Sequence, residues 1–416
     1  MWTLCTGLTS VVIGNGVTDI EFNAFSGCSN LANVIIGDNV KYIGSKAFEG
    51  CTALNGIVFP DNLADINEQA FYKCSGLTNI VIGNGVRYID SSAFFGCSSL
   101  KTVINCSKLT FSKGATDYGY VAYYADKVIN APNGYVDGDY VWAVVNEENT
   151  LCGYIGNEKE LVLPGSCNGE DYAIGNSAFY NCTGLTSIEI PSVITDIKDD
   201  AFYGCTGLKE VHISDLTAWC KIYFSNIYAN PLYYANNLYL NGELVADVVI
   251  PDVLPEVNEY AFINCTGLTN VVVSDGVDVI GESAFSGCSN IETLYISNSI
   301  YSIGDNAFAG CNKIYDIKVG AKKPIGGNLN IFANAVYDNA TLYIPNGTKS
   351  LYDKREPWNR FFYIKEMDFT GIEDVYDEVK DENVKLKGVC YDMQGRVVEN
   401  PTSGIYIIDG KKVLVK

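Results

Sequence analysis

The sequence has almost no histidine, no long apolar run and few basic residues, and each shortage excludes a class of function. Its one histidine, His212, has no matching residues around it for a histidine-based catalytic triad or a histidine-rich metal site. No run of about 18 apolar residues is present, so no segment is expected to span a bilayer. There are 28 Lys and Arg against 49 Asp and Glu, and the formal charge of −21 would repel nucleic-acid phosphates.

Sequence motifs for catalysis and cofactor binding are missing as well. There is no Cys-x-x-Cys zinc spacing, no glycine-rich phosphate loop and no Gly-x-Ser-x-Gly elbow. Asp137-Gly138-Asp139 holds only a fragment of a calcium loop and reads better as a hairpin turn. We therefore expect no enzymatic activity, no cofactor and no metal, and we interpret the many carboxylates as solvated surface.

What the chain does have is a repeat of 23 residues, which its cysteines mark. The repeat cysteines are Cys5, Cys28, Cys51, Cys74, Cys97, Cys182, Cys205, Cys265, Cys288 and Cys311. Within one coil the alternation around Val34 and Ile36 predicts a short strand, Gly37 begins a turn, and Ala47-Phe48 lies on the returning side. The sequence therefore predicts a β-rich solenoid of about twelve 23-residue coils with one short strand each, because a lone coil could not bury its apolar residues.

The fixed spacing of the cysteines argues against a disulfide framework, although the chain has 15 of them. Side chains that stack in one parallel column do not converge as the Cβ atoms of a disulfide must. We expect the ten repeat cysteines to form a buried ladder of thiols. Cys152 and Cys167 lie outside the column and are either a pair or two unrelated thiols.

Two interruptions and a changed ending divide the chain. The repeat is expected over residues 1–366, with interruptions at about 105–157 and 214–241 and a terminal cap at about 321–366. The first interruption is rich in tyrosine and predicts a hairpin at Asp137-Gly138, while Asn241-Gly242 predicts another. Whether the interruptions leave the solenoid or stack as degenerate coils stays open. Residues 367–387 read as an acidic linker and 388–416 as a small β unit.

The start of the chain falls within a coil, because Met1-Trp2 stands where Ala-Phe would precede Cys5. We expect that a signal peptide and an N-terminal cap lie upstream in a longer precursor, which would place the protein outside the cell or at its outer surface.

The repeat from Cys28 to Gly50 resembles the BspA-type bacterial leucine-rich repeat, since period, Cys and Ala-Phe agree at many coils. The segment with Leu342-Tyr343-Ile344-Pro345, Tyr352 and Trp358 resembles the closing segment common in that family. The end of the chain, from Tyr391 through Gly404-Ile405-Tyr406 to Val413, is similar to type IX secretion sorting tails. These resemblances imply a leucine-rich-repeat solenoid that is secreted or surface-bound and adheres to host or bacterial surface proteins.

The strand face that points away from the core is the candidate binding surface. Apolar residues dominate its N-terminal half and polar or aromatic residues its C-terminal half. Exposed apolar surface often marks a partner site, whereas β-branched residues also occur in strands for their propensity alone, and both interpretations stay open. We expect Glu189 to neighbour His212 one coil away. The central column reads Val12, Ile35, Val58, Val81, Ile104, Glu189, His212, Val272, Tyr295 and Lys318.

Two functions of different classes follow from this reading. The first is a cell-surface or secreted adhesin, a scaffold that binds proteins through the strand face. The alternative is a carbohydrate-binding module whose Tyr-rich excursions stack on sugar rings. Neither predicts a nucleic-acid partner, and the sequence leaves the ligand and the oligomeric state open.

Overall fold

The computed structural model describes residues 2–327, 330–369, 390–391, 404–408 and 411–415. These residues form two compact units, which are described separately. The N-terminal unit comprises Met1–Asn157 and Cys167–Tyr180, and the C-terminal unit comprises Glu158–Ser166 and Asn181–Lys416. Both units are parallel β-solenoids, so the predicted fold class is confirmed.

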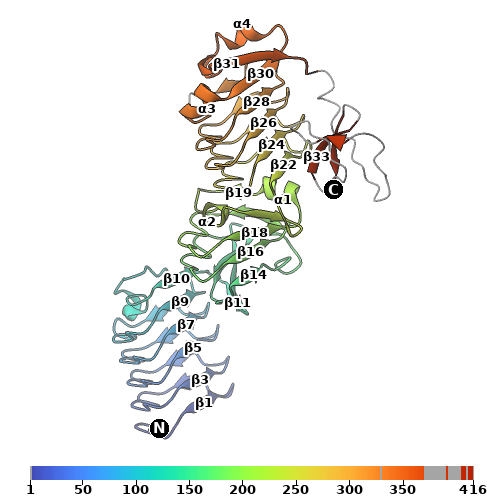
Figure 1. Cartoon of the computed structure of the whole chain (residues 1–416). Coiled ribbons are helices and arrows are strands. Elements are labelled where there is room, and N and C mark those ends of the chain that lie inside the picture. Colours follow the sequence, from blue (N-terminus) through green and yellow to red (C-terminus); the bar gives the residue numbers. More distant parts are fainter. Residues whose placement is uncertain (1, 328–329, 370–389, 392–403, 409–410, 416) are drawn as a thin grey trace. The chain divides into compact units, whose positions relative to one another are not determined.

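Strands in the N-terminal unit stack one above the next (Figure 1). Apart from a break between the second and third strands, each pairs in parallel with the strand one repeat away, as Val11 does with Val34 and Ile80 does with Val103. Alternate side chains of each strand enter the core because successive Cβ atoms point to opposite faces. These strands are β1 (Ser10–Ile13), β3 (Asn33–Ile36), β5 (Gly56–Val58), β7 (Asn79–Ile82) and β9 (Thr102–Asn105).

A second, shorter ladder runs beside the first. Each regular coil adds a two-residue strand whose isoleucine is buried and whose other residue faces outward, as in Tyr42–Ile43. The repeat pattern predicts one strand per coil and does not reveal this second one, because two residues are too few to show an alternation. The ladder consists of β2 (Asp19–Ile20), β4 (Tyr42–Ile43), β6 (Asp65–Ile66) and β8 (Tyr88–Ile89).

Two columns of identical side chains fill the core. The rings of Phe48, Phe71 and Phe94 stack with centroids 5.2 Å apart. Beside them the thiols of Cys51, Cys74, Cys97, Cys288 and Cys311 each donate to a phenylalanine carbonyl, as Cys74 Sγ does to the oxygen of Phe48 at 3.0 Å. The fourteen cysteines from Cys5 to Cys311 are all free thiols, and Cys28, Cys51, Cys74, Cys97, Cys205, Cys265, Cys288 and Cys311 are buried. The predicted thiol ladder is therefore confirmed at those positions, while Cys5 and Cys182 are only half-buried.

The backbone conformation explains why glycine often stands immediately before the repeat cysteine. Gly50 and Gly310 lie there at φ of +70° and +79°, a region that most side chains disfavour. Where the position is not glycine, Lys73 and Asn181 adopt the same left-handed conformation at some cost. The turn is thus a property of the coil, and glycine fits it with the least strain.

The first interruption contains both of the alternatives that the sequence left open. A short helix, η1 (Tyr118–Tyr120), precedes β10 (Lys127–Asn130), which pairs in parallel with β9 and so completes an enlarged coil. An antiparallel meander follows, made of β11 (Tyr135–Asp137), β12 (Tyr140–Val145) and β13 (Glu148–Tyr154). The hairpin predicted at Asp137-Gly138 is confirmed as the β11–β12 turn. The meander rejoins the parallel ladder through β15 (Tyr172–Ile174).

The C-terminal unit repeats this architecture in two stretches. In the first, β14 (Glu160–Val162), β16 (Ser187–Ile190), β18 (Glu210–Ile213) and β20 (Leu238–Leu240) form a parallel ladder, and β17 (Ile194–Ile197) pairs with β19 (Tyr223–Phe224). In the second, the long ladder is β22 (Asp247–Ile250), β24 (Asn270–Val273), β26 (Thr293–Ile296), β28 (Asp316–Val319), β30 (Thr341–Pro345) and β31 (Tyr363–Met367) (Figure 1). Its shorter companion is β23 (Glu256–Val257), β25 (Val279–Ile280), β27 (Ser302–Ile303) and β29 (Gly326–Gly327).

The second interruption is an enlarged coil that still stacks. Asp215 caps the helix α1 (Leu216–Lys221) with bonds from two backbone amides, and α2 (Leu232–Ala235) follows before β20. The predicted Asn241-Gly242 hairpin is confirmed between β20 and β21 (Glu243–Leu244). In regular coils an alanine carbonyl accepts from the phenylalanine amide of the preceding coil, but the carbonyl of Ala261 accepts instead from Trp219 Nε1 and Asn230 Nδ2.

The last described coils end in β30 and β31, with three short helices between or before them. These are α3 (Asn334–Asn339), α4 (Lys349–Tyr352) and η2 (Trp358–Arg360). Tyr352 and Trp358 are fully buried and donate to the carbonyls of Ala321 and Ile325. Beyond Phe369, the predicted acidic linker at 367–387 lies almost wholly outside the described residues. Of the predicted β unit, β32 (Cys390–Tyr391), β33 (Gly404–Ile408) and β34 (Lys411–Val415) form an antiparallel sheet.

Candidate binding surface

Three large apolar side chains stand exposed in a row on the strand face of the N-terminal unit. Val12, Ile35 and Val58 are 70%, 62% and 63% exposed. Val12 and Ile35 are register partners on β1 and β3, and Val58 occupies the matching place on β5. Asn33 lies on the same face and is also exposed, so the row has polar residues beside it. We call Val12, Ile35 and Val58 the apolar stripe.

The expectation that this stripe runs on to Ile104 is wrong. Val81 and Ile104 continue the column in register, but Val81 is half-buried and Ile104 is 2% exposed. Ile104 belongs to a separate apolar cluster with Ile129, Val141 and Ala143. The reason is that the meander packs strand β12 over the outward side chains of β9 and β10, which closes the strand face there.

In the C-terminal unit the predicted register of Glu189 and His212 is confirmed, and Tyr239 extends it by one strand. The imidazole of His212 stacks on the ring of Tyr239 at 4.7 Å, and its Nε2 lies 3.2 Å from the carboxylate of Glu210. Val162 occupies the same column before Glu189 and is largely exposed. Val162 and Tyr239 were not predicted in this column, because their strands belong to longer, irregular coils where a step of 23 residues does not find the register.

The second column of this unit is polar and aromatic, as expected, but more covered than expected. Val272 was expected on the open face but is only 8% exposed, and its register partner on the next strand is the much larger Tyr295. Tyr295 pairs with Lys318, Lys318 with Tyr343 and Tyr343 with Lys365. Burial, together with the nearby Asp316, raises the pKa of Tyr343, so this phenol stays neutral and can donate a hydrogen bond.

Cys152 and Cys167, which lie outside the column, are not paired with each other. Cys152 and Cys167 are both free thiols, and the thiol of Cys167 lies 3.8 Å from the hydroxyl of Tyr135. Burial raises the pKa of Cys152 to about 12, so its thiol is neutral at physiological pH. Within the described residues no group of three or more metal-ligating side chains is found.

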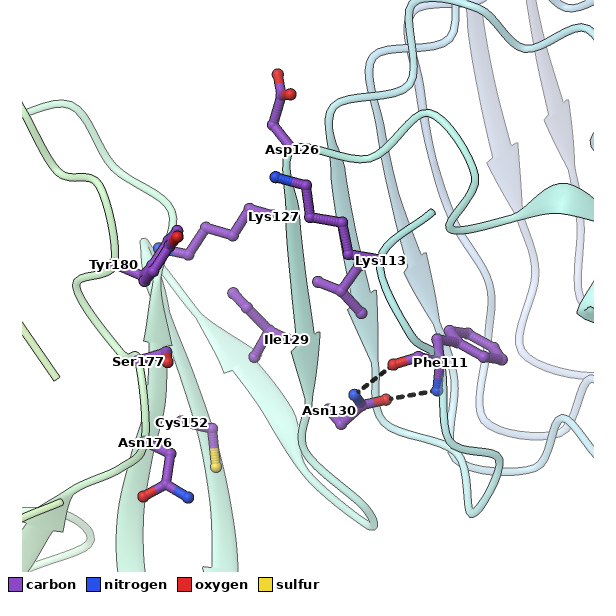
Figure 2. Close-up of a pocket in the computed structure, with 11 residues that line it drawn as sticks. Phe111, Lys113, Asp126, Lys127, Ile129, Asn130, Cys152, Asn176, Ser177 and Tyr180 are labelled. Carbon is purple, nitrogen blue, oxygen red and sulfur yellow. Dashed lines mark hydrogen bonds between the residues drawn. The ribbon is translucent and has the colours of Figure 1, made fainter. Parts of the chain in front are cut away.

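A pocket of about 460 Å³ opens within the N-terminal unit beside β10 (Figure 2). One wall is a continuous stretch of chain, residues 126–130, and the opposite wall includes Cys152, Asn176 and Tyr180. Lys127 reaches across, and its ammonium donates to the carbonyls of Tyr154 at 2.8 Å and Ala178 at 3.3 Å. Asn130 is held by two bonds to the backbone of Phe111. Apart from Cys152, which was considered only as a possible partner of Cys167, none of these residues was predicted to line a site, because the pocket arises where the repeat breaks.

Comparison with known protein families agrees with this architecture. The BspA type leucine rich repeat region matches in six copies, over residues 2–116, 172–238 and 233–354. The chain belongs to this family. Families built on such scaffolds are generally non-enzymatic, and leucine-rich-repeat folds commonly bind proteins. A search of curated proteins finds no match.

Solved structures include leucine-rich repeat proteins that resemble this BspA-type chain. One from Bacteroides ovatus is 24% identical over 88% of this chain and 85% of that one, with a TM-score of 0.39. A leucine rich cell surface protein from Faecalibacterium prausnitzii is 19% identical over 87% of this chain and 79% of that one, with a TM-score of 0.22. No helix among the described residues is long and apolar enough to cross a membrane.

Proposed function

We propose that this protein is a cell-surface or secreted adhesin that binds a protein partner through the apolar stripe. The observation that carries the proposal is the row of three β-branched side chains, each more than 60% exposed, on consecutive strands. A contiguous apolar row with polar neighbours is typical of a protein interface. Its removal from water on binding contributes favourable free energy. The partner would be a surface protein of the host or of another bacterium.

Two aspects of location belong to the same proposal. Export would bring the stripe to extracellular partners, and the C-terminal segment would act as the sorting tail. Immunodetection of the protein on intact cells, with and without residues 388–416, tests both. Loss of surface signal is expected when the segment is removed.

The stripe is tested by placing a charge on it. We predict that Val58→Glu abolishes binding to immobilised extracellular-matrix proteins while the melting temperature stays nearly unchanged, because an outward carboxylate remains hydrated. The matched control is Ile57→Glu on the same strand: Ile57 is 3% exposed, and an unpaired buried carboxylate should cost several kcal/mol. Binding by Val58→Glu equal to that of the wild type would contradict the stripe as the site.

A carbohydrate-binding function is the second candidate, and a cluster of rings supports it. Tyr72 stacks on Phe95 at 5.7 Å, Phe95 meets the edge of Tyr120, and Tyr120 meets Tyr123. Phe95 and Tyr123 are partly exposed, so part of each ring is available to contact a sugar. A glycan array probed with wild type and Tyr123→Ala separates the two functions: glycan binding lost in Tyr123→Ala and kept in Val58→Glu would favour this candidate.

A further inference from the structure

Strand β10 ends its sheet, and this leaves one of its edges open. The sheet runs β10-β9-β7-β5, and no other described strand pairs with β10. The amides of Lys127 and Ala131 donate toward β9, to the carbonyls of Lys101 and Asn105. Backbone groups alternate sides along a parallel strand, so Val128 and Asn130 direct their N–H and C=O groups to the opposite edge.

The pocket runs along this open edge. Its lining includes five consecutive residues, 126–130, which is the whole of β10 and the residue before it. Figure 2 shows the strand passing along one side of the space, with Tyr180, Ser177 and Asn176 across from it. Lys127 holds the two walls together through its bonds to the carbonyls of Tyr154 and Ala178. A gap of this kind interrupts a ladder in which strands otherwise stack at about 4.8 Å.

We propose that the open edge of β10 binds an extended peptide segment of another protein, which adds a strand to the sheet inside the pocket. The N–H and C=O groups of Val128 and Asn130 lie along this edge as alternating hydrogen-bond donors and acceptors. The backbone of an extended peptide presents the complementary groups at the same spacing. The volume is within the range of sites that hold small ligands or a few residues of peptide. This site is separate from the apolar stripe and does not rest on it.

Charge around the edge adds a preference to the backbone pairing. Lys113 and Lys127 line the pocket against a single acidic side chain, Asp126. A segment with an acidic residue at one end therefore fits better than a basic one, and the preference weakens with salt because Lys113 is exposed.

The test uses a fluorescein-labelled peptide, Asp-Thr-Val-Ile-Asn, which is the sequence of residues 102–105 with an aspartate placed before it. Residues 102–105 already pair with the other edge of β10, so the peptide has the required geometry, and the aspartate meets the charge preference. Binding is followed by fluorescence anisotropy, and hydrogen exchange reports the amides of Val128 and Asn130. We expect saturable binding and slower exchange at those two amides. An absence of binding would overturn the proposal.

Two variants at Val128 distinguish backbone pairing at the edge from non-specific binding of the peptide. Val128→Pro removes one edge donor without touching the bonds to β9, and Val128→Thr keeps the donor with a similar shape. Binding should weaken about tenfold in the first and stay unchanged in the second, since about 1 to 1.5 kcal/mol is lost with one hydrogen bond. If Val128→Pro binds as the wild type does, the proposal fails.

Peptides methylated on backbone nitrogen give the same test on unmodified protein, in case the proline variant does not fold. Methylation of one alternate set of amides should abolish binding, and methylation of the other set should leave it intact. Equal effects of the two sets would show that the backbone does not pair with β10. Val58→Glu should bind the peptide normally, because the stripe lies on other strands.

Discussion

At the scale of single residues, the repeat cysteine is a small apolar side chain with one weak donor. Its thiol occupies the same place in each regular coil and donates to a backbone carbonyl, most often that of a phenylalanine, as Cys97 does to Phe71 at 3.2 Å and Cys28 does to Trp2 at 3.0 Å. Burial raises the pKa of Cys51 and Cys97 to about 12 from 9.0. The thiols therefore stay neutral in the folded state well into the alkaline range.

This shift predicts a dependence of stability on pH. The folded pKa lies above the unfolded one, so the contribution of each thiol is fully present below about pH 9 and is lost as the pH rises toward about 12. We expect the free energy of unfolding in urea to fall between pH 9 and 11, by up to about 1.4 kcal/mol per pH unit for each such thiol. The double variant Cys51→Ala/Cys97→Ala should show a smaller slope than the wild type.

The comparison uses the slope of the unfolding free energy against pH in each protein. The absolute free energies are not compared, because the alanine substitutions also leave small cavities. Equal slopes for the wild type and the double variant would contradict the burial of these thiols. A second measurement is alkylation at pH 8, in which Cys51 and Cys97 should react only after unfolding.

At the scale of elements, the regular coil was predictable and the interruptions were not. The regular coil occurs many times in the sequence, so its core positions can be recognised by their recurrence. Leu31 recurs as Leu54 and Val34 as Ile57, and all four are buried. The meander occurs once, and no period reveals which face it packs on. The burial of Ile104 depends on Val141, 37 positions away in the chain, and its own residue type is the same as that of the exposed Ile35.

In the enlarged coil around α1, side chains replace the backbone amide that bonds to the next coil in regular repeats. We therefore expect this coil to be sensitive to substitution of those side chains. Asn230 is fully buried, its Nδ2 donates to the carbonyls of Tyr260 and Ala261, and its Oδ1 accepts from the amide of Leu232. Asn230→Leu, of similar size, should lower the free energy of unfolding by about 2 to 3 kcal/mol because buried backbone groups lose their partners.

The control for this prediction is Asn237→Leu. Asn237 is half-buried, and its side-chain Nδ2 donates one 3.3 Å hydrogen bond to the carbonyl of Lys209. We expect its substitution to change the free energy of unfolding by no more than about 1 kcal/mol. Urea denaturation measures both variants. A similar small effect in the two would mean that water or the backbone readily replaces the Asn230 amide.

At the scale of the whole molecule, the repeat makes coils interchangeable as long as the register is kept. Removal of residues 52–74 takes out one full period and joins Cys51 to Ser75 in phase. We expect this variant to fold with a cooperative melt and an unchanged circular dichroism shape, because each coil contacts mainly its neighbours.

Removal of one residue more, 52–75, is the control. It shifts each later strand by one position relative to the Cys51 coil, and in a strand that exchanges inward for outward side chains. This variant should expose apolar surface and bind a hydrophobic dye. Folding of both deletions with equal stability would argue against a core that depends on the 23-residue phase.

The constant step of the ladder also bears on how the chain reaches its fold. Val11 with Val34 and Leu294 with Ile317 are both pairs of residues 23 apart. The loop that must close before two coils meet is therefore equally short throughout the regular regions, and its entropic cost does not grow with the number of coils. Folding can begin at any regular pair and advance by one coil at a time. A somewhat longer loop must close where β10, β16, β20 and β30 join their ladders, because their register partners lie 25 or 27 residues away.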